Sequence, residues 1–412
     1  MNTWLVIVLS IILFSFALEL IVSLLNIGAL TPNLPKEFET IYNKDEYKKS
    51  QEYTKATTQF GILENCISTS LTVAFIVLGG FNWIDTLARQ FGYNAIITGL
   101  IFTGILALLS FLIGIPFSVY STFVIEEKFG FNKTTLKTFI LDIIKGALLA
   151  ILLGGPLLAL IFWFFEATGT YAWVYCWIGV VAFSILMQFI APVLIMPLFN
   201  KFTPLEPGEL KDKINLYSVK EKFHLSGIFT MDGSKRSTKL NAFFTGFGKF
   251  RKIVFFDTLT EELTPDEIVA VLAHEMGHFK LKHIIKMMAI SILQTGFMFF
   301  LLSLFLKVPE ISKGFMLEQT SIYASLVFFG FLYSPISLFT SIGFNILSRK
   351  HEFEADHYAA KTTGDSVQLV TSLKKLSRAN LSNLTPHPIH VFLHYSHPPL
   401  LDRINTLQSK ES

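Results

Sequence analysis

Long apolar runs alternate with polar segments along this chain of 412 residues. A run of about 20 apolar residues is long enough to cross the hydrocarbon core of a bilayer as a helix. The first run is too long for the apolar part of a signal peptide and no Lys or Arg precedes it, which favours a membrane span over a cleaved leader. The pattern predicts seven spans, at residues 4–27, 62–82, 95–119, 145–165, 171–195, 284–306 and 321–346.

Basic residues are unevenly distributed over the predicted loops. The loops at 28–61 and 120–144, the segment 196–283 and the C-terminal tail are rich in Lys and Arg, whereas the loop at 83–94 holds only Arg89. Rich and poor loops alternate, as seven spans require when basic loops stay in the cytosol. We therefore expect the N-terminus in the lumen or periplasm and the C-terminus in the cytosol.

The composition agrees with a protein that contacts lipid. Hydrophobic residues make up 51% of the chain and charged residues only 16%, compared with about 25% charged residues in an ordinary soluble protein. The net charge of +3 is too small to indicate nucleic acid as a partner. Cys66 and Cys176 both lie in apolar runs, which argues against a disulfide framework.

The spans divide the chain into four parts. Residues 1–195 hold the first five spans, 196–283 form a candidate catalytic domain, 284–346 hold the last two spans, and 347–412 complete the catalytic domain. Both polar parts are predicted on the cytosolic side of the membrane, so they can meet.

Short elements are predicted inside the first polar part. Residues 227–232 and 252–257 have the pattern of short strands, with 240–246 between them. The run 233–250 is rich in Gly and basic residues and suggests a hairpin, and 203–222 opens with Pro and Gly and continues as a polar helix.

A strong helix start follows these strands. Thr264 can serve as the N-cap, Pro265 suits the first helical position, and Glu267 lies three residues after the cap. This arrangement is a capping box, in which the two side chains satisfy each other's backbone amides.

The helix that starts there carries the pattern His-Glu-x-x-His. His274 and His278 are four residues apart, so they share one face of the helix and can bind one metal ion. Glu275 lies beside them and can accept a proton from a water molecule. The alternative is an exposed helix with two unrelated histidines. We expect His283, after the motif, to face the membrane surface.

A catalytic zinc ion needs a third protein ligand and an open position for water. Glu352 and Asp356 share one face of a predicted helix after the last span; Glu352 can bind zinc and Asp356 can accept a hydrogen bond from a ligand imidazole. We expect Glu354 to be solvated. His351 and His357 are rival ligands, ranked lower because neither has a carboxylate one turn away on the same face. The alternative is an ordinary charged helix at the membrane surface.

Several motifs together resemble the Ste24-type CAAX prenyl proteases, which are membrane zinc endopeptidases of the gluzincin kind. They are HEMGHFKLKH, EFEAD, NAFFTGFG and YSHPPLLDRI, together with KSQEY and EEKFGFNKTT, and the resemblance extends over most of the chain. It implies a mainly α, multi-pass membrane protein, a helical barrel that encloses a chamber, with a zincin-like α+β domain facing the cytosol. It also implies one Zn²⁺ per chain, bound by His274, His278 and Glu352, with Glu275 as the base and Asp356 as the partner of a ligand.

Two further segments gain roles from this resemblance. The run Asn241-Ala242-Phe243 resembles the edge strand on which zincins bind substrate by strand addition, the alternative being a plain hairpin strand. His397 is presented by a turn that two prolines stiffen, and without the resemblance it is equally well a turn residue. His397 and Arg403 are expected to stabilise the oxyanion of the reaction.

The predicted reaction is hydrolysis of a peptide bond in a peptide or protein substrate, including removal of the C-terminal tripeptide of prenylated CAAX substrates. One rival is a quality-control protease that ignores prenyl groups. A protease that cuts inside membrane helices is disfavoured, because Asp266, Glu267, Lys280 and Lys282 bracket the motif. A seven-span receptor or channel with an incidental motif predicts no zinc. The compact loops favour a bacterial inner membrane, and a eukaryotic chain would occupy the endoplasmic reticulum.

Overall fold

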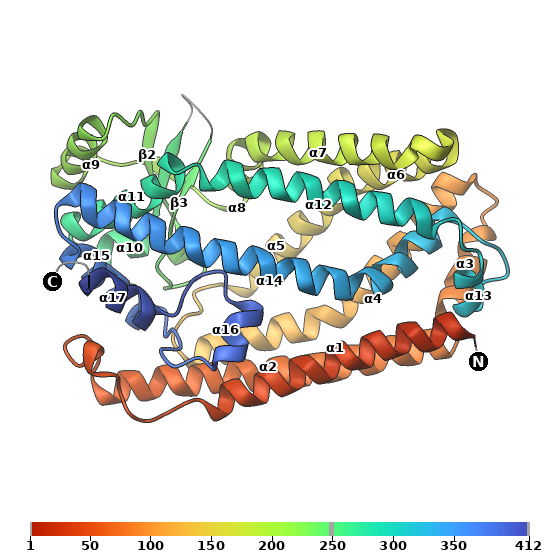
Figure 1. Cartoon of the computed structure of the whole chain (residues 1–412), viewed down its shortest axis with the longest axis horizontal. Coiled ribbons are helices and arrows are strands. Elements are labelled where there is room, and N and C mark those ends of the chain that lie inside the picture. Colours follow the sequence, from red (N-terminus) through yellow and green to blue (C-terminus); the bar gives the residue numbers. More distant parts are fainter. Residues whose placement is uncertain (1, 247–250, 410–412) are drawn as a thin grey trace.

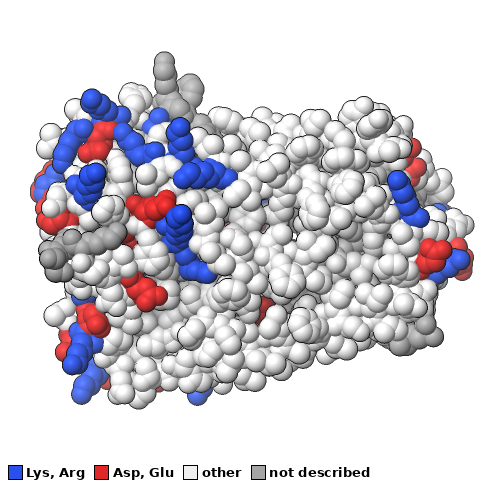
Figure 2. All heavy atoms as spheres, viewed as in Figure 1, with Lys and Arg blue, Asp and Glu red and all other residues white. Residues whose placement is uncertain are grey.

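The computed structural model describes residues 2–246 and 251–409. Its long helices run along the longest axis of the molecule, with the N-terminus at one end and the small sheet, α9 and α11 at the other (Figure 1). In Figure 2 the charged side chains gather at the two ends, above all at the end with the sheet, and a broad band between them carries almost none. This distribution is what a protein with a membrane-embedded middle requires.

Within the described residues, seven helical segments are long and apolar enough to cross a membrane, which confirms the predicted number of spans. Three segments contain a π-helical turn, at Ser121–Glu126, Ala150–Gly154 and Ala191–Ile195. The helices of the seven segments are α1 (Thr3–Gly28), α2 (Lys44–Val77), α4 (Ala95–Tyr120), α5 (Leu136–Leu149) with α6 (Gly155–Ala167), α7 (Ala172–Ile190) with α8 (Met196–Phe199), α12 (His283–Phe305) and α14 (Ile322–Thr363).

Two spans differ clearly from their predicted bounds. The helix α2 begins far before the predicted residue 62, because Asn43 and Glu46 form a capping box with hydrogen bonds of 2.8 and 3.0 Å. The helix α14 continues past the predicted end at 346 and stops only at Gly364, where φ is 103°. Hydropathy marks the part of a helix that lies in lipid and misses polar turns that extend beyond it.

The sheet lies at the charged end of the molecule and has the strand order β1-β2-β4-β3 within the described part of the chain. Strands β2 and β4 are parallel, whereas β3 pairs antiparallel with β4 at one edge. Three strands were predicted; β1 was missed because three residues are too few for an alternating pattern. Residues 247–250 of the predicted hairpin run lie outside the described residues. The strands are β1 (Phe202–Pro204), β2 (Gly227–Met231), β3 (Ala242–Thr245) and β4 (Lys252–Phe256).

The remaining helices surround the sheet or close the ends of the bundle. The polar helix predicted within 203–222 is confirmed as α9. These helices are α3 (Gly80–Arg89), α9 (Glu209–Lys220), α10 (Asp257–Glu262), α11 (Pro265–Lys280), α13 (Glu310–Gly314), α15 (Val367–Ala379), α16 (Pro388–His394) and α17 (Leu400–Gln408).

A hydrophobic core fixes α11 against the sheet and against α14. Leu272, Ala273 and Met276 of α11 are buried with residues of β4 and α15 in this core. On the other side, a Cβ atom at Gly277 would lie 3.0 Å from the Cα atom of Ala355 in α14. The two helices can therefore approach this closely only because position 277 has no side chain.

Replacing this glycine should push the two helices apart. We expect Gly277→Val to destabilise the protein by about 1–3 kcal/mol through overpacking, visible as a lower melting temperature in detergent. Gly343→Val, in α14, is the matched control, because no atom lies within 4 Å of a Cβ built at Gly343. Equal melting temperatures for the two variants would contradict the close approach.

Candidate active site

The N-terminus of α11 is anchored as its sequence predicts. The backbone N–H of Thr264 donates to Glu267 at 2.8 Å, and the backbone N–H of Glu267 donates to the Thr264 hydroxyl at 3.4 Å. Lys375 of α15 adds an ion pair of 2.8 Å to the buried Glu267 carboxylate. The helix that carries the metal-ligand motif is thus tied to its neighbour before the motif begins.

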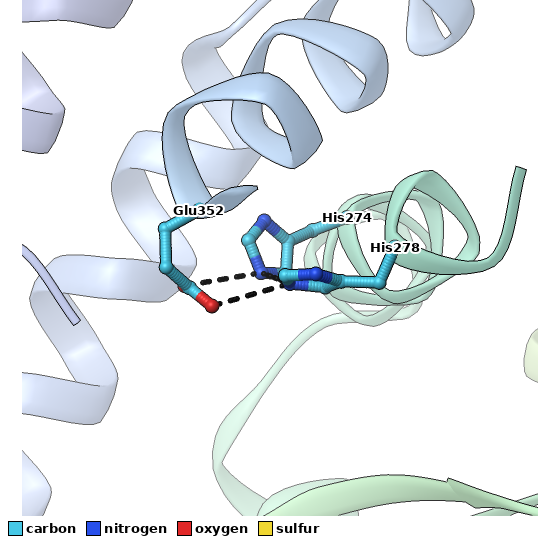
Figure 3. A group of neighbouring side chains, drawn as sticks. All are labelled: His274, His278 and Glu352. Carbon is cyan, nitrogen blue, oxygen red and sulfur yellow. Dashed lines mark hydrogen bonds and ion pairs between the residues drawn. The ribbon is translucent and has the colours of Figure 1, made fainter. Parts of the chain in front are cut away.

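Three side chains from two helices converge on one point (Figure 3). His274 and His278 extend from α11, and Glu352 extends from α14 toward them. The two Nε2 atoms are 3.2 Å apart, and the Glu352 carboxylate lies 3.5 Å from the first and 3.2 Å from the second. The structure therefore brings together the three residues predicted from the sequence as zinc ligands.

These distances fit a metal ion. Ligand atoms about 2.0–2.1 Å from a tetrahedral zinc ion are about 3.3 Å from one another, close to the separations found here. The Oε2 atom of Glu352 is buried and accepts no hydrogen bond from the described residues. Nη1 of Arg403 lies 3.4 Å from this oxygen, which still has lone pairs available for a cation between the three side chains.

The surroundings of His274 also favour positive charge. Burial by itself would lower the pKa of His274, but hydrogen bonds to Asp356 and Glu352 outweigh it and raise that pKa to about 9. Asp356 lies 2.8 Å from Nδ1 of His274, on the side of the ring away from Glu352. A proton on Nδ1 leaves the Nε2 lone pair for a metal, so Asp356 is placed as predicted.

A cavity of about 680 Å³ opens onto the three ligands. Glu275, half-buried on α11, lines it, and so do Asn241 and Ala242 at the start of β3 and His397 before α17. The predicted base, the predicted substrate strand and the predicted oxyanion donor thus face one space beside the ligands. This space is where a peptide bond would have to lie for these groups to act on it.

The strand β3 forms the edge of the sheet at this cavity. One side of β3 pairs with β4 from Ala242 to Thr245, and the sheet order leaves the other side as an edge. The side chain of Asn380 forms two hydrogen bonds with the backbone of Leu240, the residue before Asn241. It accepts from the Leu240 N–H at 2.8 Å and donates to the Leu240 carbonyl at 3.1 Å. No motif surrounds Asn380, the residue after α15, so local sequence patterns did not indicate this role.

His397 and Arg403 occupy different positions around the ligands. The His397 side chain is 66% exposed, and its Nε2 atom lies 3.4 Å from Glu352. Arg403 is buried, and its guanidinium donates to Asp356 at 2.8 and 2.6 Å and lies 3.4 Å from Glu352. Both residues line the cavity, but His397 is exposed there, whereas the hydrogen bonds of Arg403 go to Asp356.

The expectations for three nearby residues need correction or refinement. His283 is not at the membrane surface but only 2% exposed, and Glu354 is not merely solvated, since it lies 2.9 Å from His283. Both placements arise from tertiary contacts that no local pattern predicts. His357 is exposed and takes no part in the group formed by the three predicted ligands.

A second cavity of about 510 Å³ lies on the membrane side of His278. Apolar side chains of α12 and α14 line much of it, including Ile284, Met287, Met288 and Phe344. Two cavities therefore meet at His278, and this second one is the more apolar of the two.

Comparison with known proteins places most of the chain in one group. Residues 23–201 match the family described as CAAX prenyl protease N-terminal, five membrane helices, and residues 204–411 match Peptidase family M48. The chain is 35% identical to CAAX prenyl protease 1 homolog of Arabidopsis thaliana over 392 residues, which cover 92% of this chain and 91% of that protein. It is 37% identical to CAAX prenyl protease 1 of Saccharomyces cerevisiae over 404 residues, with 91% and 88% covered.

A solved structure shows the same architecture. The crystal structure of S. mikatae Ste24p is similar with a TM-score of 0.94 and 34% sequence identity, over 99% of both chains.

Removing the carboxylate behind His274 should weaken metal binding. We expect Asp356→Ala to lower zinc affinity about 10–100-fold, because the partner that orients a ligand imidazole is lost. Competition with a chromogenic chelator measures this affinity. Asp402→Ala removes an exposed carboxylate of α17 and serves as the control. A zinc affinity of Asp356→Ala equal to that of the control would contradict the role of Asp356.

Proposed function

Because this chain belongs to peptidase family M48 and to the CAAX prenyl proteases within it, we propose that it is a zinc endopeptidase that removes the C-terminal tripeptide of prenylated CAAX substrates. One observation carries the proposal: His274, His278 and Glu352 converge beside Glu275 in a cavity lined by the start of an edge strand. One Zn²⁺ per chain, held by these three ligands, would lower the pKa of a water to about 7 and polarise the scissile carbonyl.

The protein's own groups supply proton transfer and positioning. Glu275 accepts a proton from the attacking water and returns it to the leaving amine as the peptide bond breaks. His397 faces the same cavity and donates a hydrogen bond to the oxyanion as it forms. Arg403 acts on the ligand His274 indirectly, because its hydrogen bonds to Asp356 hold that carboxylate beside His274.

The substrate backbone is proposed to add to the free edge of β3. In this arrangement the peptide extends the sheet through backbone hydrogen bonds at Ala242. The Oδ1 atom of Asn241 already accepts from the N–H of Ala242 at 2.8 Å, so the side-chain amide of Asn241 is oriented for donating to a substrate carbonyl. The hold of Asn380 on Leu240 keeps the start of this strand in register with the ligands.

The apolar cavity beside His278 supports a prenylated substrate. Its lining by Ile284, Met287, Met288 and Phe344 suits an isoprenoid chain attached near the scissile bond. The alternative is a quality-control protease that ignores prenyl groups. Its substrates would have no isoprenoid chain to place in this cavity.

The proposed location follows from the two ends of the molecule. The N-terminus and the catalytic site lie at opposite ends (Figure 1), and Figure 2 shows most of the charge at the catalytic end. Basic ends of membrane proteins stay in the cytosol, so we place the catalytic end there. The compact loops favour the inner membrane of a bacterium, and in a eukaryote the same topology would serve in the endoplasmic reticulum.

Loss of the base should abolish cleavage without loss of metal. We expect Glu275→Gln to cut a farnesylated CAAX peptide about 10²–10⁴-fold more slowly than wild type and to retain zinc by metal analysis. Adding 1,10-phenanthroline to wild type should also stop cleavage. Glu206→Gln, at an exposed position, is the matched control. An active Glu275→Gln protein would remove this mechanism.

Dependence on the lipid group separates the two candidate substrates. We expect kcat/KM for a farnesylated peptide to exceed that for the same peptide without the farnesyl group by about 10-fold or more, because burial of each CH₂ group contributes about 0.8 kcal/mol. Met287→Glu should reduce this preference by placing a charge in the apolar cavity. Equal rates on both peptides in wild type would favour the quality-control protease.

A further inference from the structure

The chain reverses direction immediately after the metal-ligand helix. Lys282 adopts a left-handed conformation with φ of 60°, which a residue other than glycine rarely does. This turn ends α11 and starts α12 at once, so that His283, the first residue of a membrane helix, returns toward the helix before it. The imidazole of His283 is buried as a result.

A line of hydrogen-bonded rings leads from the ligand His278 to a carboxylate. Nδ1 of His278 lies 3.1 Å from Nδ1 of His283, and Nε2 of His283 lies 2.9 Å from Glu354. Because Nε2 of His278 faces the other ligands, its proton belongs on Nδ1, which donates to Nδ1 of His283. The proton of His283 is then on Nε2, where it is donated to Glu354. One set of tautomers satisfies every atom in the line.

The same residues could be mistaken for a second metal site. Ligand atoms of His283, His351 and Glu354 all lie within 4.8 Å of one another. However, the rings of His283 and His351 are stacked face to face, with centroids 3.9 Å apart and planes 9° apart. The lone pair of an imidazole nitrogen lies in the ring plane, so two parallel stacked rings cannot direct lone pairs at one ion. Both nitrogens of His283 are also already engaged.

We propose that His283 and Glu354 are positioning residues that fix the tautomer and orientation of the zinc ligand His278. A carboxylate or carbonyl usually accepts the second N–H of a ligand histidine directly. His274 follows this arrangement through Asp356, whereas His278 reaches its carboxylate through an interposed imidazole. The inference rests on the proposed zinc site, and it assigns the ligand's support to residues of two membrane helices, α12 and α14.

The proposal is tested by zinc affinity, measured by chelator competition on the full-length protein in detergent. His283→Phe keeps a flat ring against His351 but removes both hydrogen bonds, and we expect about 10–100-fold weaker zinc binding. Glu354→Gln should weaken binding in the same direction to a smaller extent. His351→Phe is the matched control: it alters the other ring of the same stack, which makes no hydrogen bond to His278 in the described structure, and should bind zinc like wild type.

Two further readouts separate positioning from packing. In the Co²⁺-substituted protein, His283→Phe should change the visible absorption of the metal, whereas His351→Phe should not. His283→Asn should bind zinc more tightly than His283→Phe, because its Oδ1 atom can accept from His278 in place of Nδ1. This smaller variant also provides the test if His283→Phe fails to fold.

The outcomes distinguish this inference from the proposed function. If wild type holds no zinc, the proposed function and the inference both fail. If wild type holds one zinc per chain and His283→Phe binds it as tightly, the inference alone is overturned. Equal weakening by His283→Phe and His351→Phe would also overturn it, because packing of the two rings would then explain the effect.

Discussion

The close contact between α11 and α14 determines what this protein can do. A Cβ atom at Gly277 would lie 3.0 Å from the Cα atom of Ala355, and within one turn of this contact the His274 and His278 rings meet Glu352. The contact places carboxylates in a buried setting, where isolated charges are costly. Arg403 donates two hydrogen bonds to Asp356, whereas it approaches Glu352 only to 3.4 Å, and that oxygen accepts no hydrogen bond in the described structure. The fold thus creates a local need for a cation at the point where the ligands converge.

The catalytic part is joined to the membrane part through side chains as well as through the chain itself. Lys239, just before β3, pairs with Glu126 of the third span at 2.9 Å and donates to the hydroxyl of Tyr53 in the second span at 2.8 Å. Tyr53 in turn donates to Glu126 at 2.5 Å. Tyr53 belongs to the KSQEY motif and Glu126 to the EEKFGFNKTT motif, and the sequence alone did not indicate that these two motifs are in contact. The second and third membrane spans therefore help to position the edge strand β3.

Local patterns predicted those features that one helix or one cap determines. The ligand pair His274 and His278, the capping box at Thr264 and the face shared by Glu352 and Asp356 all follow from helical spacing. His283 could not be placed, because its position depends on a left-handed turn at Lys282 that no composition rule demands. Asn380 was missed because it acts on a strand far away in the sequence. The spacing of residues within one helix can be read from the local sequence. The partners of polar residues such as His283 and Asn380 depend on tertiary packing, which the local sequence does not show.

The helix α14 crosses the lipid region and then carries Glu352 without interruption. A helix of 42 residues is about 63 Å long at 1.5 Å per residue, and Pro335 within it is a position where helices bend. The tilt of a membrane-spanning helix depends on the thickness of the membrane. A change in the tilt of this long, rod-like helix would therefore also move its polar end, which carries Glu352. Because α11 packs tightly against α14 at Gly277, both walls of the metal site would move together with this rod. Membrane thickness would thereby set the height and orientation of the site relative to the bilayer, while the distances between its side chains stay the same.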